Sequence, residues 1–463
     1  MHVTHTLFVD REKELEVLDR AWSEKPVFIV VYGRRRTGKT RLVLEWCRRR
    51  NIPSIYYHAV PARHEVNLRG LARAVEEQLS LKGFSRLRYD SLDSLLENLS
   101  YRQRESLIVI DEFTYWVRGS PSVVGELQKF IDHYLAETGF AIIVVGSLVG
   151  VMYREVLSGG APLYGRARYR IRLGELEPWY IPLFYKDRGL EDIIRLYSLL
   201  GGVPYYHQIA KGISGEAVDI VLELFLKDNA PLRDEALFLL REEFREPSVY
   251  YSVLQAIARG ANTISRISDY TGIHRQHLPK YISILRDLGF VKYEKPLFTK
   301  KGYYRISDKI LNTWFKLVEP LISQAIRLPV KRIREKTSKA IEEITGEVFE
   351  EIALKYVEYL ASQNKIAFDE IGKFIHKGVE VDIVAIDHKN KMVHLFEVKW
   401  SKTSSIEALR IMRKLQRKAA NIPLDYDYRI HLITREYSGE KIGGIEIHTL
   451  NNMPFHYNKY KNS

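Results

Sequence analysis

The 463-residue sequence has one cysteine, Cys47, and no apolar run long enough to cross a bilayer. One cysteine by itself cannot build a disulfide framework or a zinc site, and its presence as a single packed thiol fits a reducing compartment. The first ten residues are polar and lack the apolar core of a secretory signal. These absences predict a cytoplasmic protein without a membrane partner.

Acidic residues are also fewer than basic residues. Lys and Arg total 71 against 58 Asp and Glu, which gives a formal net charge of +13 with neutral histidines. Such an excess favours a polyanionic partner, although a charged, heat-tolerant surface explains it equally well. The length exceeds that of one compact core and predicts two to three domains.

The strongest motif follows an apolar run at residues 27–32. The octapeptide Gly33-Arg-Arg-Arg-Thr-Gly-Lys-Thr40 fits the P-loop pattern G-x-x-x-x-G-K-[ST], with helical apolar spacing after it. Gly33 and Gly38 allow backbone amides to surround the β-phosphate, Lys39 supplies charge to the β- and γ-phosphates, and Thr40 ligates Mg²⁺. Arg41 completes this part of the predicted nucleotide-binding set. ATP and Mg²⁺ are therefore the predicted cofactors.

An acidic strand accompanies the P-loop. Residues 106–110 are mostly apolar and lead into Asp111 and Glu112. Asp111 is expected to hold the magnesium hydration shell, and Glu112 to act as the base that orients the attacking water. A third apolar strand, 141–145, leads to Ser147, a candidate sensor of the γ-phosphate. Apolar strands alternating with helices predict an α/β fold with a parallel sheet covered on both faces.

Further pieces carry a family resemblance. The P-loop, the Ile-Asp-Glu-Phe strand and Pro162-Leu-Tyr-Gly-Arg166 together resemble the archaeal ATPase family, close to the STAND and AAA+ groups, over roughly residues 5 to 230. Phe8 to Leu15 and Gly201 to Pro204 resemble segments that contact the adenine in such ATPases, which implies a base contact for Pro204. The resemblance also implies that Arg166 is a phosphate sensor or arginine finger, unless it is only part of a basic loop. Action in trans would require a homo-oligomer, and action in cis would not.

The middle of the chain predicts a winged helix-turn-helix. Helical patterns at 250–259, 263–271 and 274–288 precede two short strands, 290–293 and 302–306. The basic and polar residues expected to face DNA are His274, Arg275, Gln276, His277, Lys280, Lys295, Lys300 and Lys301. STAND-type ATPases also use this module as an intramolecular brace, so both roles stay open.

The C-terminal third predicts a helix from Gly346 and a hairpin of strands 379–386 and 393–399. Glu397 and Lys399 lie two residues apart and therefore share one side of their strand, within reach of Asp382 on the partner strand. Asp382 and Glu397 could bind Mg²⁺ or Mn²⁺, and Lys399 could orient the water that attacks a phosphodiester.

This pattern resembles the PD-(D/E)xK nuclease superfamily, and Glu350 matches the helix carboxylate of archaeal Holliday-junction resolvases. The same third looks like an uncharacterised domain commonly fused to archaeal ATPases. The residue directly before Asp382 is Val381, where the superfamily motif has a proline. A surface ion pair and an inactive nuclease fold are the alternatives to a working metal site.

The predicted domains are a P-loop ATPase core, a helical lid, a winged helix-turn-helix and a restriction-endonuclease-like α/β domain, at residues 1–180, 181–245, 246–320 and 321–463. The predicted function is ATP-controlled binding and cleavage of DNA, branched or structured DNA included. The rival hypothesis is a STAND-like regulatory or scaffold ATPase whose C-terminal modules only bind. An origin-recognition-like loader is a third hypothesis, against which the nuclease-like tail argues.

Overall fold

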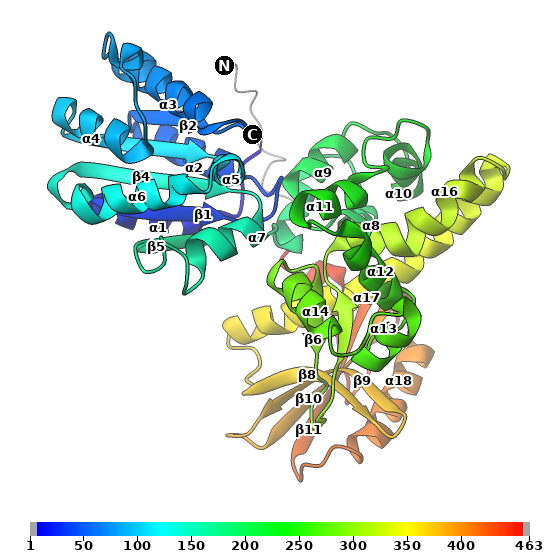
Figure 1. Ribbon diagram of the computed structural model, residues 1–463. Coiled ribbons are helices and arrows are strands. Elements are labelled where there is room, and N and C mark those ends of the chain that lie inside the picture. Colours follow the sequence, from blue (N-terminus) through cyan, green and yellow to red (C-terminus); the bar gives the residue numbers. More distant parts are fainter. Residues whose placement is uncertain (1–6, 457–463) are drawn as a thin grey trace. The chain divides into compact units, whose positions relative to one another are not determined.

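The computed structural model describes residues 7–456 and divides into two compact units (Figure 1). The first contains the chain up to Leu176 together with Val203–Tyr205. The second contains Glu177–Gly202 and the chain from Tyr206 onward.

A five-stranded parallel sheet forms the centre of the first unit, as the sequence predicts. Its strands are β1 (Val27–Tyr32), β2 (Ser54–His58), β3 (Glu105–Asp111), β4 (Gly139–Gly146) and β5 (Tyr169–Arg172). Their spatial order is β2-β3-β4-β1-β5, and every neighbouring pair is parallel. The carboxyl ends of all five strands therefore meet at one edge.

Helices cover both faces of this sheet (Figure 1). One face packs against α1 (Glu12–Ser23) and α2 (Lys39–Arg50), and the other against α3 (His64–Leu79), α4 (Leu92–Arg102), α5 (Phe113–Gly119) and α6 (Ser122–His133). Along β1, Val27 and Ile29 enter one core while Phe28 and Val30 enter the other. Burial on both faces explains why the strands are apolar at almost every position.

The second unit begins with helices in the range expected for a lid, of which α9 has its first two residues in the first unit, followed by the elements expected for a winged helix. They are α8 (Leu190–Leu200), α9 (Pro204–Ala210), α10 (Ala217–Val221), α11 (Glu235–Glu243), α12 (Pro247–Ala258), α13 (Ile264–Thr271), α14 (Leu278–Asp287), β6 (Val291–Glu294), β7 (Tyr303–Ile306), α15 (Lys309–Thr313) and α16 (Glu319–Ala325). Helix α14 starts later than His274, the expected start, because Pro279 suits only the first turn of a helix. The two strands pair in antiparallel fashion.

One long helix, α17 (Val330–Ser362), runs through the second unit for 33 residues. It begins 16 residues before Gly346, the expected start, because the intervening segment contains no proline and is rich in residues that favour helix. It packs against α8, α10, α16 and the C-terminal sheet. Among residues 7–456, no helix has the combination of length and apolar character needed to span a membrane.

The C-terminal sheet has the order β12-β11-β10-β9-β8. Its strands are β8 (Glu370–His376), β9 (Val379–Asp387), β10 (Met392–Ser404), β11 (Asp427–Ser438) and β12 (Glu446–His448). The first three are antiparallel, whereas β10, β11 and β12 are parallel, joined first through helix α18 (Ser405–Ala419). Helix α18 covers one face, and α17 packs on the other through Phe349 and Tyr356.

A partly buried carboxylate joins α17 to the β6–β7 hairpin. Glu351 accepts from Lys309 at 2.5 Å and from Arg305 at 3.0 Å, and Lys292 lies 3.5 Å away. Burial by itself raises the pKa of Glu351, but the three cations outweigh it and lower the pKa to about 2. The carboxylate of Glu351 is therefore ionised in the folded protein at any pH above about 2.

We predict that Glu351→Gln lowers the free energy of unfolding by about 3 kcal/mol, because it leaves three partly buried cations without their shared anion. The stabilisation of the native carboxylate should be complete above the pKa of an unfolded glutamate, about 4.3, and should be lost as the pH falls toward 2. Denaturant titrations between pH 7 and pH 3 measure both effects. Glu347→Gln is the control, because Glu347 pairs with Lys316 and is 45 % exposed. Equal stability of the two variants would contradict the prediction.

Candidate functional site

The P-loop lies between β1 and α2, where two glycines have conformations that other residues rarely adopt. Gly33 has φ = 150°, and a Cβ atom there would lie 2.3 Å from the carbonyl oxygen of Leu173. Gly38 caps α2 in the left-handed region at φ = 97°. The loop conformation therefore depends on glycine at both positions.

Two P-loop side chains lie where the sequence predicts them. Lys39 is 5 % exposed, and its ammonium donates to the Arg34 carbonyl at 2.9 Å. The Thr40 hydroxyl donates to Asp111 Oδ2 at 2.7 Å. The contact between Thr40 and Asp111 joins the P-loop to the carboxyl end of β3, 71 residues further along the chain.

Asp111 has two additional partners on β2 that the sequence did not reveal. The Tyr56 hydroxyl donates to Oδ2 at 2.6 Å, and His58 Nδ1 lies 3.7 Å from the same oxygen. Burial alone would raise the pKa of Asp111, but contacts from His58, Tyr56 and Thr40 lower it below its usual range. Asp111 is thus held as a buried anion, the state that a magnesium-binding carboxylate requires.

Glu112 and Ser147 also lie together. Ser147 Oγ donates to Glu112 Oε2 at 2.5 Å, and Glu112 has a left-handed backbone at φ = 51°. The contact arises because β3 and β4 are neighbours whose carboxyl ends meet. Left-handed backbone at a non-glycine residue is typical of functional turns.

Arg11 is a residue of this region that the sequence analysis did not select. It is 6 % exposed, and its Nη2 donates to the carbonyls of Gly174 at 2.9 Å and Thr37 at 3.5 Å. Burial lowers the pKa of Arg11 more than Glu14 and Asp10 raise it. Its place inside the Phe8–Leu15 motif was the available signal, since that motif contains one arginine.

Three other predicted residues are found in different settings. Arg41 lies 3.9 Å from Glu45 along α2, and Pro204 is the first residue of α9. Next to Pro204, the Tyr205 ring lies 4.4 Å from the guanidinium of Arg36, a P-loop residue. Arg166 forms a two-pronged ion pair with Asp132 of α6, at 2.7 and 2.8 Å.

The second unit contains the predicted carboxylates. Phe396 of β10 pairs with Ile383 of β9 in antiparallel register. Asp382 and Glu397, the next residue along each strand, are therefore opposite each other. The amide of Val398 donates to Asp382 Oδ2 at 2.8 Å. Burial, followed by the charges of Glu397 and Glu350, raises the pKa of Asp382 to about 6. The hairpin therefore brings its carboxylates together, as the two-residue period of a strand predicts.

Glu397 is almost fully buried and pairs with two lysines. Lys399 Nζ lies 2.9 Å from Oε1, and Lys418 Nζ of α18 donates to Oε2 at 2.9 Å. Burial raises the pKa of Glu397, but these lysines lower it below the usual range. A hollow of about 610 Å³ opens beside it, lined by Asp382, Glu397, Lys399, Lys414, Arg417 and Lys418, among others.

Glu350 reaches the same region from α17. Its Oε2 accepts from Lys373 of β8 at 3.2 Å, and its charge acts on both Asp382 and Lys399. Asp382, Glu397 and Lys399 thus line one hollow, and Glu350 acts on Asp382 and Lys399 through its charge. Lys373 was missed by sequence analysis because it is far from the E-x-K motif in the chain and carries no motif of its own. Lys418 was expected only as part of a basic helix face at 406–420 that could hold the DNA backbone, and not as a partner of Glu397.

These features of the first unit define a class: a P-loop nucleotide hydrolase with a parallel central sheet. A family model described as "ATPase domain predominantly from Archaea" matches residues 8–208, and one described as "Archaea bacterial proteins of unknown function" matches residues 314–411. The chain belongs to this archaeal ATPase family, and its use of a nucleoside triphosphate with Mg²⁺ follows from that membership. The predicted family resemblance is confirmed, including the fused C-terminal domain.

Individual relatives agree with this assignment. An uncharacterized protein of Methanocaldococcus jannaschii is 31% identical over 429 residues, which cover 91% of this chain and 94% of that protein. An uncharacterized ATP-binding protein of the same organism is 47% identical over 47 residues, 10% of this chain and 80% of that protein. The Walker-type ATPase structure of Pyrococcus abyssi has a TM-score of 0.52 and 22% identity, and covers 66% of this chain and 96% of that one.

We predict that Thr40→Ala lowers kcat/KM for magnesium-ATP by more than about 100-fold, because loss of a metal ligand exceeds the 10- to 100-fold effect of losing an outer partner. Thr40→Ser is the matched control and should keep most of the activity, because it retains the hydroxyl that reaches Asp111. Phosphate release at several magnesium concentrations measures both variants. If Thr40→Ser were as impaired as Thr40→Ala, the hydroxyl would not be the important group.

Proposed function

We propose that the chain is an ATP-regulated DNA-processing enzyme, in which the nucleotide state of the ATPase controls a metal-dependent nuclease-like site. The observation that carries the proposal is that Asp382, Glu397 and Lys399 line a basic hollow, while Glu350 lines a second hollow together with Asp382. These residues come from α17, β9 and β10, and a random surface ion pair does not require carboxylates from three elements.

We assign α12 to β7 as a winged helix-turn-helix. Three helices precede an antiparallel two-stranded sheet, and Gly272 ends α13 in a left-handed conformation at φ = 72°. The basic and polar side chains in the turn before α14 and in its first turn are exposed: His274, Arg275, Gln276, His277 and Lys280. An exposed cationic helix start suits contact with phosphates and base edges.

We assign the C-terminal sheet, covered by α17 and α18, as restriction-endonuclease-like. Asp382 and Glu397 supply oxygen ligands suited to Mg²⁺ or Mn²⁺, and Lys399 lies next to Glu397, where it could orient water toward a phosphorus atom. In the present arrangement Lys399 and Lys418 neutralise Glu397. A divalent cation would compete with these ammonium groups for the same oxygens.

DNA is the favoured substrate because cations surround the carboxylates. Lys414 and Arg417 of α18 are exposed at the hollow, where they could hold phosphates. Lys292 and Lys295 of the wing line a second hollow together with Glu350 and Asp382. The wing and the carboxylate site therefore share a surface within the second unit.

The same wing supports a second candidate function. The Leu297 amide donates to the Lys373 carbonyl at 2.8 Å, so the wing tip is bonded to edge strand β8. This contact favours the brace role and hence a STAND-like scaffold ATPase whose C-terminal modules only bind DNA or partners. The two candidate functions differ in whether the carboxylates bind metal and cut.

We predict that the full chain cleaves labelled branched, single-stranded or duplex DNA in the presence of Mg²⁺ or Mn²⁺. Asp382→Asn and Glu397→Gln should each lower the cleavage rate more than about 100-fold, because loss of a metal ligand exceeds the 10- to 100-fold effect of losing an outer partner. Lys39→Ala should change the dependence on ATP without removing the metal site. Glu370→Gln, an exposed carboxylate on the neighbouring strand β8, is the control. Hydrolysis of ATP without any cleavage, combined with unchanged Mn²⁺ binding in Glu397→Gln, would favour the scaffold.

Arg166 enters the proposal as a finger that acts in trans. Tyr169 of β5 pairs with Ile29 of β1, and Ile29 lies three residues before Tyr32, the end of β1. Arg166 lies a further three residues before Tyr169 in the chain. At about 3.3 Å per residue, Tyr169 alone is about 10 Å from the edge where the P-loop begins. Arg166 therefore lies toward the opposite end of its own sheet, which favours a neighbouring subunit as its target.

We predict that Arg166→Ala lowers kcat for ATP by about 1000-fold, the lower range for an arginine finger. An equimolar mixture of Arg166→Ala and Lys39→Ala should recover activity, because one subunit supplies the P-loop and the other the arginine. Arg168→Ala, which removes an exposed ion pair with Glu24, is the control. Absence of recovery in the mixture would contradict action in trans.

A further inference from the structure

Three histidines form a row across neighbouring strands of the C-terminal sheet. His394 lies on β10, His431 on β11 and His448 on β12, which are consecutive in the sheet. His431 is fully buried, and it pairs in register with Glu446 of β12. Glu446 and His448 are two residues apart and share one side of their strand.

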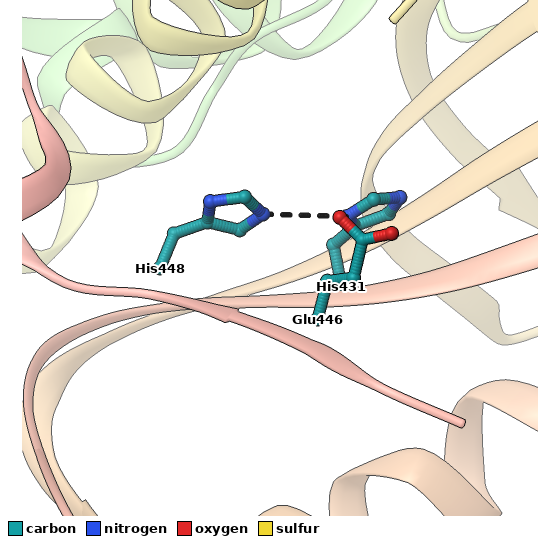
Figure 2. Close-up of side chains that lie close together, drawn as sticks. All are labelled: His431, Glu446 and His448. Carbon is teal, nitrogen blue, oxygen red and sulfur yellow. Dashed lines mark hydrogen bonds and ion pairs between the residues drawn. The ribbon is translucent and has the colours of Figure 1, made fainter. Parts of the chain in front are cut away.

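The donor atoms of three of these residues converge. His431 Nδ1 lies 3.3 Å from His448 Nε2 and 3.5 Å from Glu446 Oε2. Figure 2 shows the two imidazoles facing each other with the carboxylate beside them. One ligand atom from each residue lies within 4.8 Å of the other two.

The two separations from His431 Nδ1, 3.3 and 3.5 Å, are close to the ligand spacing of a tetrahedral metal ion. A zinc ion binds imidazole nitrogen at about 2.0–2.1 Å, so two tetrahedral ligands lie about 3.3–3.4 Å apart. We propose that His431, Glu446 and His448 bind one divalent ion of the zinc class, with the fourth position open to water. Zinc can be held without cysteine, so the single Cys47 is no obstacle to this site.

The outward nitrogens of both rings have partners of the kind that orient metal ligands. His394 Nδ1 lies 2.9 Å from His431 Nε2, and the Tyr356 hydroxyl lies 3.3 Å from His448 Nδ1. With His431 Nε2 protonated and donating to His394, Nδ1 presents a lone pair to the metal. With His448 Nδ1 protonated and donating to Tyr356, Nε2 does the same. Such outer hydrogen bonds fix the tautomer of a ligand histidine.

Burial keeps the rings neutral, which is the form that binds metal. It lowers the pKa of His431 to about 2, helped by the neighbouring His448, and that of His448 to about 4. Glu446 is 55 % exposed, which leaves a route from solvent to the ligand atoms.

This site is separate from the carboxylate site. His394 and Glu397 are three residues apart on β10 and so point to opposite faces of the sheet. The carboxylates suit hard cations such as Mg²⁺, whereas two imidazoles select zinc, cobalt or nickel. The proposal therefore does not rest on nuclease activity.

The test is titration of the full chain with Co²⁺, followed by displacement with Zn²⁺, read by visible absorption and by metal content after dialysis. We expect a four-coordinate Co²⁺ spectrum and retention of zinc at this site. His448→Gln should abolish the spectrum, and Tyr356→Phe, which keeps every ligand, should weaken affinity about 10-fold or more. His376→Gln, an exposed histidine on β8, and Glu397→Gln should leave the spectrum unchanged.

Substitutions at the edge strand avoid the fully buried His431, and circular dichroism melts would verify that each variant is folded. Loss of the spectrum in Glu397→Gln but not in His448→Gln would mean that the ion occupies the carboxylate site. Equal binding by wild type and His448→Gln, or no binding of either ion, would overturn the proposal and leave the histidine row as a hydrogen-bonded part of the core.

Discussion

Backbone pairing between strands is the constraint on which every site in this protein depends. In the first unit, parallel pairing in the order β2-β3-β4-β1-β5 brings the ends of the strands to one edge. The P-loop, Asp111 and Ser147 follow three of these strands, and they meet only because the pairing aligns those ends. A parallel sheet with helices on both faces is what makes the alignment rigid.

The same constraint operates differently in the second unit. Antiparallel pairing of β9 with β10 brings Asp382 to Glu397, and parallel pairing of β10, β11 and β12 forms the histidine row on the other face. Helix α17 then adds a residue to each site, since the charge of Glu350 acts on Asp382 and Tyr356 contacts His448. Buried charges in this unit have partners, as their desolvation requires.

Local patterns predicted much of the fold and part of both sites. Strand apolarity, the glycine spacing of the P-loop and the two-residue period of the β9–β10 hairpin each depend on neighbours in the chain, so they can be recognised without tertiary structure. The predicted starts of α14 and α17 were wrong, because helix boundaries depend on capping and on packing partners outside the segment. Tyr56 and Lys373 were missed because each reaches its partner through space from an element without a motif. Arg11 was missed although it lies inside the Phe8–Leu15 motif, because its partners Gly174 and Thr37 are distant in the chain.

The sequence by itself determined that the chain has a P-loop with an acidic strand, that it belongs with archaeal ATPases and that Asp382, Glu397 and Lys399 share a hairpin. Those properties depend on short segments of the chain whose geometry follows from local backbone rules. Only the tertiary structure decided that Tyr56 and His58 hold Asp111, that Arg166 pairs with Asp132 and that three histidines line up across β10, β11 and β12. These contacts join residues 17 to 55 positions apart, and nothing in the local sequence specifies which strands or helices become neighbours.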